Sequence, residues 1–189
     1  MASKFVSSNV VTLVLSLSLV AISTCMEIVT TNSLQNQKQL KQTNFVFYMH
    51  DRESGDSITT VPIAGIRPVK KWFLGRFGTT FVIDDLLTET PDWSSPAVGH
   101  ARGIYVNSAV AGTDIHFLFS LVFTNKEFNG SSLEIQGANE ILRRFREVSV
   151  VSGTGKFRFA RGYAIFDNYF VDMKALNAVL RWNVTVLHY

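Results

Sequence analysis

The sequence predicts an all-β fold, built as a small barrel around a ligand-sized cavity. After residue 44 the chain divides into short runs rich in aromatic and β-branched residues, separated at regular spacing by turn-forming residues. No segment has a long helical pattern, which leaves a barrel or a sandwich. Both faces of the run 114–124 are mainly apolar. This favours a barrel whose inner face lines the interior and whose outer face is covered by another copy of the chain.

The expected strands follow one another through this part of the chain. The first ends before the turn-like segment 53–57, and the second contains Pro62, which indicates an edge strand or a bulge. Only 138–144 and 171–177 fit a helical turn, and each is short. The expected strands are 45–51, 58–66, 77–84, 98–108, 114–124, 131–136, 147–151, 156–166 and 179–189.

The first 25 residues have the pattern of a secretory signal peptide. Lys4 gives a positive start, 10–22 is uncharged and mostly apolar, and small residues follow at 23–25. The apolar stretch is shorter than the ~20 residues of a transmembrane helix, so an uncleaved membrane anchor is the weaker interpretation. We expect a signal peptide at 1–25, a flexible polar segment at 26–43 and a barrel domain at 44–189. The mature protein would then be secreted to the extracellular space, without a membrane attachment.

Two acceptor sequences for N-glycosylation support export: Asn129-Gly130-Ser131 and Asn183-Val184-Thr185. We expect Asn129 to be modified more readily, because Asn-Gly suits an exposed hairpin tip. Asn183 lies within an expected strand and is accessible only if its face of the strand is exposed.

Composition and motifs exclude several classes of function. The formal net charge of +3 is too small and too scattered to indicate nucleic-acid binding. A single Cys permits neither an intramolecular disulfide nor a Cys-ligated zinc site, and the four His residues show no short metal-ligand spacing. The segment Gly153-Thr154-Gly155 fits a turn better than a dinucleotide loop. We therefore predict no metal and no cofactor, and no redox chemistry by the chain alone.

Ionisable and phenolic side chains inside apolar runs are the candidate functional residues. Asp51 alternates in phase with Phe45, Phe47 and Met49, so it is expected to point inward. An inward carboxyl group in an apolar cavity has a raised pKa and can act as a general acid, whereas a buried ion pair that stabilises the barrel is the alternative. The other candidates are Asp84 and Asp85, of which one must face each side of its strand, Tyr105 in mid-strand, Arg146 in phase with Val148 and Val150, and Arg161 in phase with Phe157, Phe159 and Tyr163.

Several motifs in this part of the chain resemble those of the plant dirigent proteins. The strongest is REVSVVSGTGKFRFARGY at 146–163, and the resemblance extends from about residue 44 to the last residue. The other motifs, in family order, are 47–51, 77–78, 82–88, 98–106 and 129–138. The resemblance implies an eight-stranded antiparallel barrel, usually a homotrimer, that is secreted to the plant apoplast. Family members have no oxidative centre, and an external laccase or peroxidase makes phenoxy radicals from coniferyl alcohol or similar phenols.

The resemblance also implies functions for some residues. Asp51, Tyr105 and Arg146 match positions that lignan-forming members are thought to use, whereas Asn139 stands where those members have an Asp and cannot act as a general acid. On this basis Asp51 is the expected acid and base, Tyr105 and Arg146 orient the phenol, and Asp84 or Asp85 supports them. We class Asn139 and Arg161 with the supporting or substrate-binding residues.

The expected function is stereoselective guidance of phenoxy-radical coupling, through binding and cyclisation of quinone methide intermediates. An alternative follows from the segment 182–189, which looks more like the branch of the family that contains pterocarpan synthases. Those proteins dehydrate an isoflavanol through a quinone methide, as cofactor-free lyases. A second alternative is a non-catalytic cell-wall protein that uses Trp72, Trp93 or Trp182 as a sugar-binding platform.

Overall fold

The computed structural model describes residues 16–24, 39–65 and 76–189. The chain separates into two compact units, Met1–Gln39 and Leu40–Tyr189. Of the first unit only a helix at 16–24 and Gln39 are described, so Cys25 and most of the predicted signal and flexible segments lie outside the described residues. Trp72 also lies outside them. Within the described residues, no helix has the length and apolar character that crossing a membrane requires.

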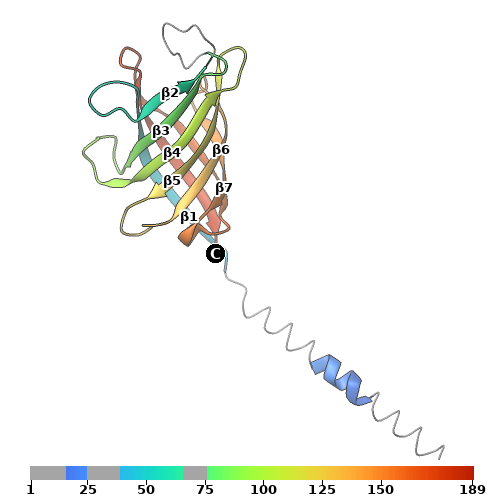
Figure 1. Cartoon of the computed structure of the whole chain (residues 1–189). Coiled ribbons are helices and arrows are strands. Elements are labelled where there is room, and N and C mark those ends of the chain that lie inside the picture. Colours follow the sequence, from blue (N-terminus) through green and yellow to red (C-terminus); the bar gives the residue numbers. More distant parts are fainter. Residues whose placement is uncertain (1–15, 25–38, 66–75) are drawn as a thin grey trace, which may run out of the picture. The chain divides into compact units, whose positions relative to one another are not determined.

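The second unit is a closed barrel of antiparallel strands (Figure 1). The sheet order is β1-β9-β8-β7-β6-β5-β4-β3-β2, and a second pairing of β3, with β1, closes an eight-stranded barrel. The β1–β3 pairing is the seam that closes the barrel. The ninth strand, β2, pairs with β3 beside this seam. The elements are β1 (Lys41–Arg52), β2 (Thr60–Ala64), β3 (Thr80–Thr88), β4 (Ala97–Asn107), β5 (Asp114–Phe123), β6 (Ser132–Glu140), β7 (Arg146–Gly153), the 3-10 turn η1 (Gly155–Phe157), β8 (Arg161–Asp172) and β9 (Asn177–His188). The eight-stranded antiparallel barrel predicted from the sequence is confirmed.

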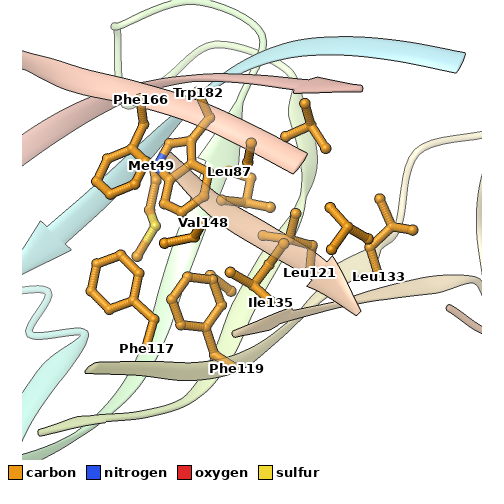
Figure 2. Close-up of a cluster of buried hydrophobic side chains, with 14 of the residues drawn as sticks. Met49, Leu87, Phe117, Phe119, Leu121, Leu133, Ile135, Val148, Phe166 and Trp182 are labelled. Atoms are coloured by element: carbon orange, nitrogen blue, oxygen red, sulfur yellow. The ribbon is translucent and has the colours of Figure 1, made fainter. Parts of the chain in front are cut away.

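Alternation along the strands fills the barrel with aromatic and aliphatic side chains (Figure 2). Trp182 is fully buried and stacks on Phe166, with ring centroids 4.3 Å apart, and on Phe47 at 6.2 Å. Aromatic pairs at such distances contribute about 0.5–1.5 kcal/mol each beyond burial. Because Trp182 is part of the core, the prediction that it serves as a sugar-binding platform is wrong.

The two ends of the barrel differ. At the end where β1 begins, four phenylalanines from different elements pack with ring centroids 5.1 to 5.8 Å apart. They are Phe45, Phe123, Phe128 and Phe157. This aromatic plug fills the barrel at that end, and the pocket lies toward the end where β1 finishes.

Three local predictions are corrected or refined by the structure. The run 156–166 is not one strand, because η1 ends at Phe157 and β8 begins at Arg161. In the connection Phe159 has φ +65° and is 73% exposed, which breaks the expected alternation and leaves Arg161 exposed. No helix forms at 138–144 or 171–177, where strand ends are joined by turns. The predicted irregularity near Pro62 is confirmed, because the β2–β3 register shifts between Pro62 and Ala64.

Candidate functional site

A pocket of about 490 Å³ lies at the open end of the barrel. Its lining comes from β1 and β4 to β9 and from the loops that join them. The volume lies within the range of sites for one drug-sized molecule. The larger apolar side chains in the lining are Met49, Ile115, Phe117, Ile141, Leu142, Val171, Met173, Leu176 and Leu180. The polar side chains in the lining include Asp51, Glu53, Tyr105, Asn139, Arg146 and Asn168.

The alternation of side chains along each strand explains why these polar groups lie together near the open end of the barrel. Asp51 is two residues beyond the buried Met49 on β1, and Arg146 is two residues before the buried Val148 on β7. Inward positions near the open end of the strands therefore carry polar groups, whereas the inward positions below them carry the core.

Asp51 is the acidic centre of the pocket. Its Oδ1 is buried and has no hydrogen-bond partner among the described residues, as is also true of the hydroxyl of Tyr105. Burial raises the pKa of Asp51 to about 6, although interactions with the hydroxyls of Thr60 and Tyr105 act in the opposite direction. Burial and the charge of Asp51 raise the pKa of Glu53 to about 7. Asp51 therefore exchanges a proton near neutral pH, as a general acid or base must.

Tyr105 presents its phenol to the same part of the pocket. It is 2% exposed and stacks on Phe81, with ring centroids 4.8 Å apart. Burial, followed by the charges of Asp51 and Glu53, raises the pKa of Tyr105 well above its ordinary value. Its hydroxyl thus keeps its proton and is available to donate a hydrogen bond to a ligand.

Arg146 is a buried cation whose hydrogen-bond partners are neutral. It is 6% exposed, and its Nη2 donates to Asn168 Oδ1 at 2.5 Å while its Nη1 donates to Asn139 Oδ1 at 3.3 Å. Its guanidinium carbon lies 4.6 Å from the ring centroid of Phe166. The Nε is buried without a partner among the described residues, and burial lowers the pKa of the guanidinium. A ligand oxygen with negative charge would complete this environment.

The structure gathers some of the predicted site residues and separates others. Asp51, Tyr105, Asn139 and Arg146 line the same pocket. Asp85 is fully buried behind Asp51 and outside the pocket lining.

Two of the predicted site residues lie on the outside of the barrel. Asp84 binds His100 Nδ1 at 2.7 Å and Arg102 Nε at 3.1 Å on the outer face. Arg161 donates to the backbone carbonyls of Val151 and Ala160 and does not reach the pocket.

The remaining sequence candidates lie on the surface. Asn129 is exposed in the turn between β5 and β6, and Asn183 is exposed on β9. Trp93 is 37% exposed, and the guanidinium carbon of Arg52 lies 4.8 Å from its ring centroid. Trp93 therefore already has a cationic partner from its own chain.

Sequence reasoning missed several residues in and near the site. Asn168 alternates in phase with Ala164 and Phe166, so strand parity alone could have identified it. Glu53 lies in the segment expected to be a turn, and Thr60 lies in the expected strand 58–66, but no pattern singled either residue out. Leu142, Met173 and Leu176 come from loops at the pocket mouth, where no periodicity exists to predict their direction.

Comparison with known proteins adds to this geometry. A family model described as Dirigent-like protein matches residues 42–187. The chain is 42% identical to Dirigent protein 1 of Arabidopsis thaliana, over 84% of this chain and 86% of that protein. It is 38% identical to Pterocarpan synthase 1 of Glycyrrhiza echinata, over 79% of each. A solved structure of a pterocarpan synthase dirigent protein superposes with a TM-score of 0.78 at 36% identity, covering 83% of this chain and 96% of the other.

Proposed function

This chain belongs to the dirigent-like protein family, and we propose that it closes a ring on a phenolic substrate through a quinone methide. Dehydration of an isoflavanol, as in a pterocarpan synthase, is the reaction that the geometry supports best. The observation that carries this proposal is the carboxyl of Asp51 on the wall of an apolar pocket, where its Oδ1 is buried without a hydrogen-bond partner among the described residues. Loss of water from a neutral alcohol needs a proton donor at the leaving oxygen, and Asp51 supplies one near neutral pH.

In the proposed reaction Asp51 protonates the benzylic hydroxyl, and the C–O bond breaks so that water leaves. The phenol para to that carbon releases its proton and becomes the carbonyl of the quinone methide. The second phenol of the substrate then attacks, forms the new C–O bond and gives its proton to Asp51. The carbonyl oxygen becomes a phenol again by taking up a proton, so the net change is loss of one water.

Arg146 and Tyr105 stabilise the charge that this sequence develops. Arg146 lies on β7, which is separated from β1, the strand of Asp51, by β9 and β8. Its charge has no carboxylate partner among the described ion pairs, so a phenolate or quinone methide oxygen can take that place. Tyr105 can donate a hydrogen bond from a third strand. The pocket thereby holds the electrophile and the attacking phenol in contact, which replaces a search in solution.

The direct test is incubation of the purified protein with an isoflavan-4-ol carrying 7- and 2′-hydroxyls, without oxidant, followed by chiral chromatography. We expect one enantiomer of the ring-closed product. Asp51→Asn should reduce the rate by about 100-fold or more, whereas Asp84→Asn on the outer face should not. Equal rates for the wild-type protein and Asp51→Asn would contradict the assignment of Asp51.

Guidance of phenoxy-radical coupling is the second candidate, and the 42% identity with Dirigent protein 1 favours it. This route also ends in a quinone methide, so the same three side chains would act on it. It requires an external laccase or peroxidase. Coniferyl alcohol with a laccase should then give an enantiomeric excess only when the protein is present. An excess here, with no product from the isoflavanol, would identify a coupling guide that functions with Asn139 in place of an Asp.

Secretion, glycosylation and trimer formation remain part of the proposal. An outer stripe of apolar side chains crosses four paired strands and supports association of copies of the chain. Its members are Val61, Val82, Ile104 and Leu118, of which Val61, Val82 and Leu118 are 40 to 50% exposed. Charges of both signs, on Asp84 and Arg102, lie beside the stripe and can pair across a symmetric interface. Light scattering should give a trimer mass for the wild-type protein and a smaller mass for Leu118→Glu.

A further inference from the structure

Two inward-facing carboxyl groups stand opposite each other at the seam that closes the barrel. The β1–β3 ladder ends with His50 opposite Leu86, so the next positions along the two strands are Asp51 and Asp85. Each is two residues from a buried core side chain, Met49 on β1 and Leu87 on β3. The closure of the barrel therefore brings a second carboxyl group behind the one that lines the pocket.

The short strand β2 enters the seam at this point and provides a link between the two groups. The backbone of Thr59 connects both strands, because its N–H donates to Arg52 O at 2.9 Å and its carbonyl accepts from Asp84 N at 2.9 Å. Thr60 follows, with 1% of its surface exposed, and its Oγ1 donates to Asp85 Oδ1 at 3.2 Å. The same hydroxyl interacts with Asp51 and lowers its pKa. A hydroxyl can donate one hydrogen bond while it accepts another, so Thr60 can join an acid to a carboxylate.

The surroundings of the two carboxyl groups favour retention of a proton. Asp85 is fully buried, its Oδ2 has no partner among the described residues, and no described ion pair includes either group. Burial and the charge of Asp51 raise the pKa of Asp85 well above its ordinary value. Glu53 and Asp84 add negative charge nearby, Tyr105 faces Asp51 from β4 with a neutral hydroxyl, and the Arg146 guanidinium on β7 is hydrogen-bonded to two Asn side chains. Two adjacent buried carboxylates are rarely both ionised, because like charges repel strongly there.

We propose that Asp51 and Asp85, linked by the Thr60 hydroxyl, form a carboxyl dyad in which Asp85 holds a proton available to Asp51. Asp85 is then a positioning residue that acts through Asp51 and never touches the substrate. This inference rests on the proposed function only in that Asp51 is the acid of the reaction. When Asp51 has lost its proton, the Asp85 carboxyl gives one to Thr60 Oγ1 while the Thr60 hydroxyl proton passes to Asp51. Thr60 is unchanged, and the single negative charge moves from Asp51 to Asp85.

The dyad predicts a distinctive dependence of the rate on pH. Above the first deprotonation, one proton remains in the dyad, and a constant fraction of molecules carries it on Asp51. The ring-closing rate of the wild-type protein should therefore fall only to a plateau between the two deprotonations. Asp85→Asn has no second carboxyl group to hold a proton, so its rate should fall about tenfold for each pH unit above the pKa of Asp51.

The matched control is Asp84→Asn, which changes the neighbouring carboxyl on the outer face of β3 and should keep the plateau. A purely structural effect of Asp85→Asn would lower the rate equally at every pH, and this result would overturn the proposal. If Asp85→Asn does not fold, Thr60 provides the test. Thr60→Ser keeps the hydroxyl and should keep the plateau, whereas Thr60→Val has a similar shape without the hydroxyl and should lose it. A plateau that survives in Thr60→Val would overturn the role of the link.

A titration of the protein without substrate separates this inference from the proposed function. Carbon-13 NMR of aspartate carboxyl groups should show one carboxyl that keeps its proton to a pH well above the ordinary range for Asp. That signal should disappear in Asp85→Asn and persist in Asp84→Asn. In Asp51→Asn the Asp85 group should titrate at lower pH, because the neighbouring charge is gone. If this carboxyl signal is observed but the protein forms no ring-closed product, the dyad stands and the proposed reaction is refuted. Ring closure without the signal would refute the dyad alone.

Discussion

Replacing Arg146 by methionine should separate the contribution of its charge to the reaction from its contribution to stability. The side chain is 6% exposed, and methionine keeps an unbranched apolar stem of similar reach without the charge. The variant loses a charged hydrogen bond of 2.5 Å to Asn168, a longer one of 3.3 Å to Asn139, and the contact with the face of Phe166.

The magnitudes decide the expected result. The short charged hydrogen bond contributes about 1.5–3 kcal/mol, the longer one about 1 kcal/mol or less, and the cation–π contact about 0.5–2 kcal/mol. Against these stands the desolvation of a cation with no carboxylate partner among the described residues, which costs several kcal/mol. These terms nearly cancel, so Arg146→Met should change the free energy of unfolding by about 2 kcal/mol or less, in either direction. The rate of ring closure should fall about 100- to 1,000-fold, as when one oxyanion-stabilising donor is removed.

The assay pairs urea unfolding with product formation. Unfolding can be followed by tryptophan fluorescence, because Trp182 stacks on Phe166, the ring over which Arg146 lies. Arg144→Met, two residues earlier and exposed, is the matched control and should change neither quantity. A loss of about 4 kcal/mol or more in Arg146→Met would refute the reasoning, since it would mean that the charge is favourably paired in the folded protein.

Three further results are expected. The contribution of Asp51 to stability should rise as the pH falls from about 6 toward 4, because its folded-state pKa is raised from 3.8 to about 6 and the unfolded chain binds fewer protons at this group in that window. Asp51→Asn should weaken this dependence by up to ~3 kcal/mol in urea titrations at a series of pH values, and an unchanged dependence would contradict the shift. Gly162→Ala should destabilise the barrel by several kcal/mol in thermal unfolding, because the new Cβ would lie 2.0 Å from Thr185 O. Gly130→Ala meets no atom within 4 Å and should cost about 1 kcal/mol, because this residue has a positive φ. Equal destabilisation by the two variants would contradict this account. Expressed in a secretory host, Asn129→Gln and Asn183→Gln should each remove one glycan mass from the protein in mass spectrometry, and an unaltered mass would show that the site is not used.

The sequence by itself determined the fold class and much of the pocket wall. Alternation is a local property, since successive residues of a strand point to opposite sides whatever the strand pairs with. The inward direction of Asp51 and Arg146 therefore followed from their phase with Met49 and Val148. Where the alternation was interrupted, the inference failed. The positive φ of Phe159 resets the phase before β8, and Arg161 lies outside the barrel as a result.

Only the tertiary structure decided which of these groups meet. Asp51 and Asp85 are 34 positions apart in the sequence, and their approach depends on the closing pair of strands and on the entry of β2 at the seam. The same holds for Arg146 and Asn168, which come from β7 and β8, and for the loop residues that rim the pocket. The pKa of Asp51 is likewise a consequence of burial and of its neighbours, and both are set by long-range packing that no local pattern encodes.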